Sequence, residues 1–534
     1  MLSTAPSLTD TPAGGDPARA ARRGLPLWAA ILAAAAAGGL LDLSFPAVGW
    51  WPLAFVSVTI ALCTMIGRSG GGAFLVGTTF GAAFFFTHLV WVGTFLGPVP
   101  WVALAGLETV LYGAGAIPLA LAYRWTDRAR GHDVLWFVGV PLLVAGVWSV
   151  RELVMGSWPY SGFPWARIGM TQTNGPTPEA ASWVGVTGLT FLIVAACACL
   201  VQWWRAGGFR RMSGILPAAV IATALVVVPQ FPTGDAGRMD IGGVQGNGPS
   251  GYFDDRASGD VLDAQTTATG PLVGERMDLL VWPEGTVDSD PLNDPAAARR
   301  LDDVVARADA PLLTNVATAR GSEVFNTSML WDGQNAPQLH DKVNPVPFGE
   351  YVTDRWFYER IVPDLVGLIQ REYTPGENPP FVTVDEVTVG LAICFDVIYD
   401  SVIWDGARQG AQVYVFQTNN ADFRGTDENL QQLAFARMRA IETGRAVVNV
   451  STVGTSQVIA PDGQIIDGAG VDQAAAAITR VPLREGLTPA VLLGGALTAL
   501  IALGAIVGLI IAGTGHLRHH HHPRHHPTRG ATDA

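Results

Sequence analysis

The chain has 534 residues, of which 49 % are hydrophobic and only 15 % are charged, and its formal net charge is −13 at pH 7. A chain of this length has room for two or more substantial units, and the acidic balance argues against a nucleic acid as partner. The charged residues are concentrated between about 233 and 486, and long apolar runs stand on both sides of that block.

The chain opens with residues 1–24, whose Ala, Pro, Gly and Asp content and clustered Arg predict a disordered cytoplasmic tail. Apolar runs of about 20 residues follow, the length that crosses a bilayer core of about 30 Å. Because several such runs follow the first one, we interpret that first run as an uncleaved helix and not as a signal peptide. The sequence therefore predicts a polytopic domain of about eight transmembrane helices, seven within 25–232 and one at 487–513. The expected spans are 27–43, 51–67, 73–95, 101–123, 134–151, 182–203, 215–231 and 487–513.

Arginine residues predict the orientation of these helices. They precede the first span and lie in the connections between spans two and three, four and five, and six and seven, and they also follow the last span. If eight helices cross, all of these arginines lie on one side, which the positive-inside rule assigns to the cytoplasm. Residues 233–486 are then extracytoplasmic. High Ala, Gly and Arg usage indicates a GC-rich bacterium, so we expect a multi-pass protein of the bacterial plasma (inner) membrane.

The charged block 233–486 alternates short β-branched runs with helical stretches, a pattern typical of an α/β domain. A helix is expected over 428–444, because its apolar spacing is helical and Gly444 ends it. After the last span, the His-rich stretch 514–534 is expected to be a solvated cytoplasmic tail, although such tracts also bind metals adventitiously.

Two residue types are rare in the charged block. Cys394 is its one cysteine, so no disulfide forms within the block. A free cysteine is often a small buried apolar residue, but an unpaired thiol on an oxidising face favours a chemical role. Lys342 is the single lysine in the whole chain. A compact ammonium group supplies a tunable pKa that the permanently charged guanidinium lacks.

Glu284, Lys342 and Cys394 each follow an expected strand, and residues at strand ends can converge on one site. A cysteine acts as a nucleophile through its thiolate, which needs a nearby base or cation. Glu284 is suited to accept the thiol proton, and Lys342 to stabilise a tetrahedral oxyanion. Singly, each of these charged residues is more often an ordinary surface group, and the combination is the specific signal.

The motifs around these residues are VWPEG (281–285), DKVNPVPFGEYV (341–352) and GLAICFD (390–396). They resemble the nitrilase superfamily, which has a Glu–Lys–Cys triad and an α-β-β-α sandwich. With the eight expected spans, and with GFPW (162–165) and ARMRAIETGR (436–445), the chain resembles the membrane-embedded apolipoprotein N-acyltransferase family of that superfamily.

This resemblance implies a reaction and its participants. Cys394 would take an acyl chain from a phospholipid as a thioester, with Glu284 as general base and Lys342 at the oxyanion. Glu350 would support the triad, and the backbone N–H of Phe395 would be a second oxyanion donor. The acceptor would be the free α-amine of the diacylglyceryl-cysteine of a lipoprotein, with ping-pong kinetics. The resemblance implies no metal and no organic cofactor.

Candidate substrate-binding residues lie outside the triad. Some are polar residues at strand ends and others are aromatic residues of loops, and they are Gln245, Trp165, Trp356, Phe357 and Asn419. We expect 351–377 to form an apolar lid over the acyl chain, the alternative being ordinary core packing. Trp165 equally fits an interfacial aromatic belt. Asp396 and Asp422 depart from the family pattern, which has Glu and an aromatic residue there, and both positions bear on acceptor choice.

Two other functions fit parts of this pattern. A membrane-anchored amidohydrolase would use the same triad with water as acceptor, although soluble hydrolases of this type need no membrane domain. A transporter or scaffold would carry ionisable residues within its spans. Here the spans carry few such residues, Glu108 being the clearest, and this scarcity disfavours transport.

Overall fold

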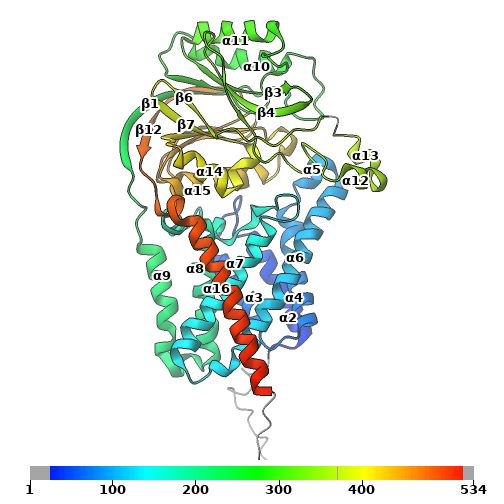
Figure 1. Cartoon of the computed structure of the whole chain (residues 1–534), viewed down its shortest axis with the longest axis vertical. Coiled ribbons are helices and arrows are strands. Elements are labelled where there is room, and N and C mark those ends of the chain that lie inside the picture. The colour runs from blue at the N-terminus through cyan, green and yellow to red at the C-terminus, as the bar shows by residue number, and fades with distance from the viewer. Residues whose placement is uncertain (1–23, 370, 521–534) are drawn as a thin grey trace, which may run out of the picture.

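The computed structural model describes residues 24–369 and 371–520, and it sets a bundle of apolar helices end to end with a two-sheet domain (Figure 1). Among the described residues, six helices are long and apolar enough to cross a membrane, and two apolar helices are shorter. All eight expected runs thus contain helix, but those over 27–43 and 51–67 have only 16 and 14 helical residues. The runs over 134–151 and 215–231 reach spanning length only together with a π-helical turn at 135–139 and 3-10 turns at 208–215. The helices of this domain are α2 (Leu27–Asp42), α3 (Pro52–Met65), α4 (Gly70–His88), α5 (Val92–Leu96), α6 (Pro98–Trp125), α7 (Val140–Met155), α8 (Ala181–Arg205), α9 (Leu216–Val227) and α16 (Pro489–His520).

The expected helix limits need correction at two places. The run 73–95 is not one helix, because α4 ends at His88 and a turn leads into the short α5. The His88 ring lies 3.0 Å from the Asp42 carboxylate, which joins the end of α4 to the end of α2. At the other terminus α16 continues beyond 513 to His520, so the first residues expected to be tail are helical. The remaining tail residues, 1–23 and 521–534, lie outside the described part.

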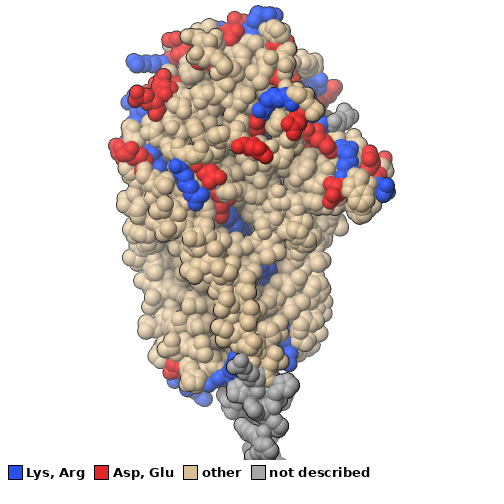
Figure 2. Space-filling model, viewed as in Figure 1, with Lys and Arg blue, Asp and Glu red and all other residues tan. Residues whose placement is uncertain are grey.

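The surface of the helical domain agrees with a bilayer location. Figure 2 shows charged side chains over the two-sheet domain and at the opposite end of the molecule, with an almost uncharged band between them. Large apolar side chains are exposed on the helices there, among them Leu32, Val220 and Leu500. A contiguous apolar surface is unusual on a soluble protein and typical of a membrane contact. The chain is therefore a membrane protein with several apolar helices.

The two-sheet domain is built from two six-stranded mixed sheets, in the orders β12-β1-β2-β3-β4-β5 and β11-β10-β9-β8-β7-β6. β1, β2 and β3 are parallel in the first sheet, as are β7, β8 and β9 in the second. The strands are β1 (Gly234–Gln245), β2 (Leu279–Val281), β3 (Leu312–Arg320), β4 (Glu323–Trp331), β5 (Gln338–Asp341), β6 (Phe381–Val384), β7 (Val387–Ile393), β8 (Val413–Thr418), β9 (Ala446–Ser451), β10 (Ser456–Ile459), β11 (Ile465–Ala469) and β12 (Ala475–Glu485). β1 and β12 begin and end next to the expected domain limits, 233 and 486.

Alternation along the strands creates the layers of the sandwich. In β8, Val413 and Val415 pack in the core between the sheets, whereas Tyr414 and Phe416 join the core shared with the membrane helices. Successive side chains of a strand point to opposite faces, so this run of apolar residues covers both. Helices α10 (Asp260–Thr269) and α11 (Pro295–Ala308) cover the first sheet, and α14 (Asp400–Arg408) and α15 (Glu428–Thr443) cover the second (Figure 1). The expected α-β-β-α sandwich is therefore present.

A buried ionic network joins the sandwich to the membrane domain. Asp400 accepts two 2.9 Å hydrogen bonds from Arg167, which lies in the loop between α7 and α8. Arg439 of α15 lies 2.8 Å from Asp400 and 2.5 Å from Glu442. Burial alone would raise the pKa of Asp400, but the two guanidinium groups lower it below its usual value. Asp400 is thus ionised and holds two cations at the junction.

We expect Asp400→Ala to destabilise the protein by about 3–5 kcal/mol, because it leaves two buried guanidinium groups without their shared carboxylate. Thermal unfolding in detergent measures the effect. Asp405→Ala is the matched control on the same helix, since Asp405 is about half-exposed and pairs with Arg408 at 3.2 Å. Equal unfolding temperatures for the two variants would contradict a stabilising role for the network.

Candidate active site

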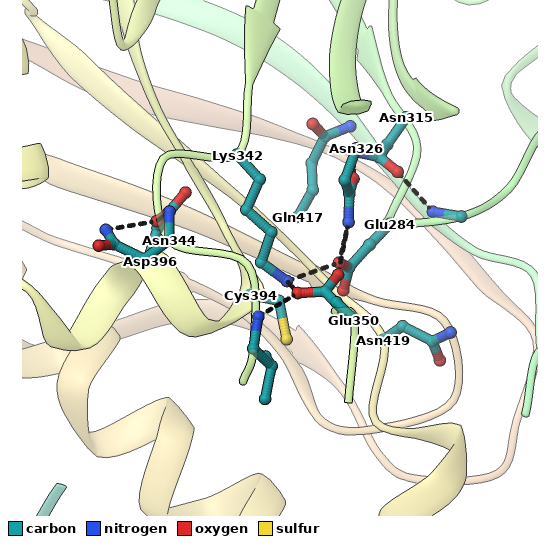
Figure 3. A network of polar contacts seen from close by, with 12 residues as sticks. Glu284, Asn315, Asn326, Lys342, Asn344, Glu350, Cys394, Asp396, Gln417 and Asn419 are labelled. Atoms are coloured by element: carbon teal, nitrogen blue, oxygen red, sulfur yellow. Dashed lines mark hydrogen bonds and ion pairs between the residues drawn. The ribbon is translucent and has the colours of Figure 1, made fainter. Parts of the chain in front are cut away.

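Three strand ends bring the predicted triad together. Glu284 follows β2, Lys342 follows β5 and Cys394 follows β7. Figure 3 shows Glu284 and Lys342 beside Cys394, with Glu350 and Asn326 in the same cluster. Cys394 has a φ angle of +48°, a left-handed conformation that is rare for a residue with a side chain. Such conformations concentrate at functional sites, where the surrounding structure holds them in place.

Lys342 is the centre of this cluster. Its side chain is 1 % exposed, and its Nζ lies 2.8 Å from Glu350 Oε2 and 3.3 Å from Glu284 Oε1. Asn326 Nδ2 donates to both carboxylates, at 2.8 Å to Glu284 and 3.1 Å to Glu350. The backbone N–H of Val346 donates to Glu350 Oε2 at 2.7 Å. One ammonium group and two neutral donors therefore fix two carboxylates beside the nucleophile.

The charges in the cluster set the protonation states. Burial by itself would lower the pKa of Lys342, but Glu284 and Glu350 together raise it well above its usual value. The pKa of Glu284 is raised, chiefly because burial disfavours its charge, and the neighbouring Glu350 adds to that effect against Lys342 and Asn326. Lys342 thus stays an ammonium, and Glu284 is a stronger base than an ordinary carboxylate.

Cys394 is a protonated thiol at rest. Burial and the negative charge of Glu284 raise its pKa well above the usual value, and Lys342 only partly offsets them. The residue is nevertheless partly accessible, so a substrate can reach it. A thiol of this kind becomes a nucleophile only while a base takes its proton. Among the charged neighbours of this thiol, Glu284 has the largest effect on its pKa, which makes Glu284 the candidate base.

Asp396 supports the turn that carries the nucleophile. It is fully buried and accepts hydrogen bonds from the backbone N–H groups of Val343 and Asn344, at 3.1 and 2.8 Å, and from the Asn344 side chain at 2.9 Å. Burial raises its pKa, and these donors together with Lys342 act against that rise. Asp396 therefore ties the segment after Lys342 to the turn after Cys394.

The polar side chains predicted to bind substrate, Gln245 and Asn419, make hydrogen bonds to other residues of the two-sheet domain. Gln245 is 1 % exposed, and its Nε2 donates to the carbonyl oxygens of Gly470 and Gln473 at 2.8 and 2.9 Å. The Asn419 amide donates to the Ser250 carbonyl at 2.9 Å and accepts from the Thr452 hydroxyl at 2.7 Å. Both amides hold loops together, because their donors and acceptors are already paired.

The predicted aromatic residues fall into two groups. Trp165 is buried at the junction of the domains, where its indole donates to Gln431 Oε1 at 2.7 Å. Phe163 stacks on Trp165 and on Phe395, with ring centroids 5.7 and 6.0 Å apart, so the loop between α7 and α8 touches the residue after the nucleophile.

Trp356 and Phe357 lie elsewhere, on α12 (Arg355–Ile361), which projects beside the membrane domain together with α13 (Pro363–Val366) (Figure 1). They are 64 % and 44 % exposed, so this part of the predicted lid presents aromatic side chains outward. Core packing, the alternative for 351–377, applies instead to Val352, Val366 and Ile369, which form a small buried cluster.

Sequence reasoning missed several polar residues of the site. Asn326 lies within β4, and Asn420, Glu428 and Gln432 lie between β8 and the middle of α15. All four are buried and hydrogen-bonded to one another or to the triad. The available signal for Asn326 was the run of three polar residues, 326–328, between apolar residues of β4. In the described residues, no three His, Cys, Asp or Glu side chains cluster as metal ligands do.

Two family models match the chain. Residues 37–199 match the apolipoprotein N-acyltransferase N-terminal domain, and residues 261–485 match the carbon–nitrogen hydrolase family. The chain is 32 % identical to an apolipoprotein N-acyltransferase of Mycolicibacterium smegmatis, over 90 % of this chain and 85 % of that protein. Proteins of the same description from Shewanella oneidensis and Pseudomonas aeruginosa are 25 % and 28 % identical, over 86 % and 87 % of this chain and 93 % and 92 % of theirs.

We expect Asn326→Leu to raise the pKa of Glu284, because the ionised carboxylate loses a hydrogen-bond donor. A hydrogen bond to a charged group contributes about 1.5–3 kcal/mol, or roughly 1–2 pH units. Since Glu284 must be deprotonated to act as base, the acid limb of the rate should move to higher pH by that amount. The burst of p-nitrophenol released on acylation by a short-chain p-nitrophenyl ester measures it. The exposed Asn335→Leu is the control, and an unmoved acid limb in Asn326→Leu would contradict this assignment.

Proposed function

The chain belongs to the apolipoprotein N-acyltransferase family, and from that premise we propose that Cys394 carries an acyl chain from a phospholipid to the N-terminal amine of a diacylated lipoprotein. The protein is an enzyme of lipoprotein maturation, and it N-acylates lipoproteins. The observation that carries the proposed mechanism is the buried Lys342 between two carboxylates at the side of the Cys394 thiol.

The first step forms the acyl-enzyme. Glu284 takes the proton of Cys394 while Sγ attacks the carbonyl carbon of a phospholipid acyl ester. The carbonyl oxygen becomes an oxyanion that Lys342 Nζ and the backbone N–H of Phe395 stabilise. When the intermediate collapses, the ester C–O bond breaks, Glu284 returns its proton to the departing alkoxide, and a lysophospholipid and a thioester on Cys394 remain.

The second step transfers the acyl chain. The neutral α-amine of a diacylglyceryl-cysteine attacks the thioester carbonyl, and Glu284 accepts a proton from the nitrogen. Collapse of the second tetrahedral intermediate breaks the C–S bond, and the Cys394 sulfur recovers its proton from Glu284. The products are an amide and the free thiol, so the enzyme is regenerated without a cofactor. Glu350 serves both steps by holding Lys342 in place through their 2.8 Å contact.

Both proposed substrates are lipids held in a bilayer, so an enzyme that acts on them has to lie at the membrane. The exposed aromatic residues of α12, Trp356 and Phe357, lie on the side of the sandwich that adjoins the helical domain, where acyl chains would arrive. Excluding water there protects the thioester from hydrolysis. The arginine distribution supports an extracytoplasmic position of the sandwich, with the helices crossing the bacterial plasma membrane several times.

Incubation with phospholipid alone should add the mass of one acyl group to the protein, because the first step needs no acceptor. Intact mass spectrometry measures this adduct, and a diacylated lipopeptide with a free N-terminal cysteine amine should then remove it and gain the same mass. Cys394→Ala should form no adduct. Lys342→Arg should form it more slowly, since a planar guanidinium does not replace the compact ammonium between Glu284 and Glu350.

The outcomes of this experiment separate the candidate functions. Loss of the adduct to water with the lipopeptide unchanged would indicate a membrane-anchored amidohydrolase. A folded protein that forms no adduct with any phospholipid tested would contradict the acyl-enzyme mechanism.

The proposed orientation predicts a labelling pattern for two introduced cysteines in a Cys394→Ala background. Ser322→Cys lies in the exposed β3–β4 turn of the sandwich, and Arg210→Cys lies in the exposed connection between α8 and α9. In cells whose cell wall and any outer membrane have been removed but whose plasma membrane is intact, a membrane-impermeant maleimide should label Ser322→Cys. It should label Arg210→Cys only after the plasma membrane is permeabilised. The reverse pattern would place the sandwich in the cytoplasm.

A further inference from the structure

A neutral hydrogen-bond donor outside the predicted triad contacts the Cys394 sulfur. Gln432, on α15, donates from Nε2 to Cys394 Sγ at 3.3 Å. Its side chain is buried, with only 4 % of the residue exposed. The hydrogen bond is made to the sulfur atom, which is the reacting atom of the proposed mechanism.

The orientation of the Gln432 amide is fixed by its neighbours. Asn420 Nδ2 donates to Gln432 Oε1 at 2.9 Å and to Glu428 Oε2 at 2.8 Å. With its oxygen occupied by Asn420, Gln432 presents its N–H₂ group to the sulfur. The direction of the Gln432–Sγ hydrogen bond therefore depends on the orientation of the Asn420 amide.

Asn420 is in turn oriented by groups on its other side. The Ser451 hydroxyl donates to Asn420 Oδ1 at 2.6 Å, and the backbone N–H of Gly454 donates to Ser451 Oγ at 2.9 Å. A backbone N–H only donates, so Gly454 leaves the Ser451 proton free to point to Asn420. The series of hydrogen bonds runs in one direction, from Gly454 through Ser451 and Asn420 to Gln432, and ends at Cys394 Sγ.

Charge near the sulfur explains why such a donor is needed. Glu284, Glu428 and Glu350 all disfavour a negative charge on Cys394, and Lys342 is the one cation that favours it in this cluster. Burial raises the pKa of Glu428 to about 8, so this carboxyl group is mostly neutral at pH 7 and its repulsion is reduced. A thiolate formed here is therefore stabilised by any further hydrogen-bond donor, and Gln432 is such a donor.

We propose that Gln432 is a catalytic residue that stabilises the Cys394 thiolate by direct hydrogen bonding, and that Asn420 is a positioning residue that orients the Gln432 amide for this role. The inference rests on the proposed function in taking Cys394 as the nucleophile. Negative charge develops on Sγ as Glu284 removes the thiol proton, and again when the C–S bond of the thioester breaks. Gln432 therefore acts in both half-reactions, whereas Lys342 acts on the carbonyl oxygen.

Alkylation of Cys394 by iodoacetamide isolates this role, because it needs the thiolate but forms no oxyanion. In Gln432→Leu, the alkylation rate at neutral pH should fall on the order of tenfold or more, and its pH midpoint should rise by about one unit, since a hydrogen bond to a charged group is lost. Asn420→Leu should shift the midpoint in the same direction by less. Gln432→His, which keeps an N–H donor, should remain nearer to the wild type. Mass spectrometry of the Cys394 peptide separates this thiol from Cys63, Cys197 and Cys199.

Gln265→Leu is the matched control, because it removes an equally buried glutamine on α10 whose amide donates to the Val244 carbonyl at 2.9 Å, and its alkylation profile should match the wild type. An unchanged profile in folded Gln432→Leu would overturn the proposal. Slow acylation of Gln432→Leu with an unchanged alkylation rate would also overturn it, because Gln432 would then act at the carbonyl oxygen. Equal losses of alkylation rate in Gln432→His and Gln432→Leu would overturn it as well. No lipid enters the alkylation assay, so failure of phospholipid-to-lipopeptide transfer would be seen separately.

Discussion

The site depends on one buried cation. Lys342 loses its hydration in the interior, and the carboxylates of Glu284 and Glu350 offset most of that cost. Two carboxylates and one ammonium group leave one excess negative charge beside Glu284, whose pKa is raised chiefly by burial and further by Glu350. The arrangement that keeps the lysine charged therefore also produces a general base. Asn326 prevents the two carboxylates from separating, because it donates to both.

The nucleophile turn is shared between the two domains. Arg439 donates to the carbonyl oxygens of Val397 and Ile398, directly after the turn, and Arg167 of the membrane domain also donates to Ile398. Phe163, from the same loop as Arg167, stacks on Phe395. The strained conformation of Cys394 is therefore held partly by side chains from the membrane domain. This shared construction gives a physical reason why the membrane helices and the sandwich belong to one chain and one catalytic unit.

Sequence patterns predicted those parts of the protein that depend on local sequence. Long apolar runs predicted the membrane helices, short β-branched runs predicted the strands, and rare residues at strand ends predicted the cluster around Lys342. They did not predict that α4 ends at His88, where the ring meets Asp42 at the end of α2, a helix remote in sequence. Nor did they identify Asn326 or Gln432, whose roles come from neighbours remote in sequence. Gln245 was predicted to bind substrate for the same reason, since only the fold reveals that its amide is paired with two backbone carbonyl oxygens.

The proposed mechanism uses different hydrogen-bond donors at two atoms, Lys342 at the carbonyl oxygen of the substrate and Gln432 at the Cys394 sulfur, because the two atoms need different amounts of stabilisation. In the proposed mechanism the oxyanion exists only in the tetrahedral intermediates, where a full positive charge such as that of Lys342 contributes most to stabilisation. Sulfur must instead be stabilised enough to ionise and still react, and the nucleophilicity of a thiolate falls as its pKa falls. A second lysine beside Sγ would produce a more stable and less reactive thiolate. A neutral amide such as Gln432, held in one orientation by Asn420, supplies a smaller stabilisation that leaves the sulfur reactive.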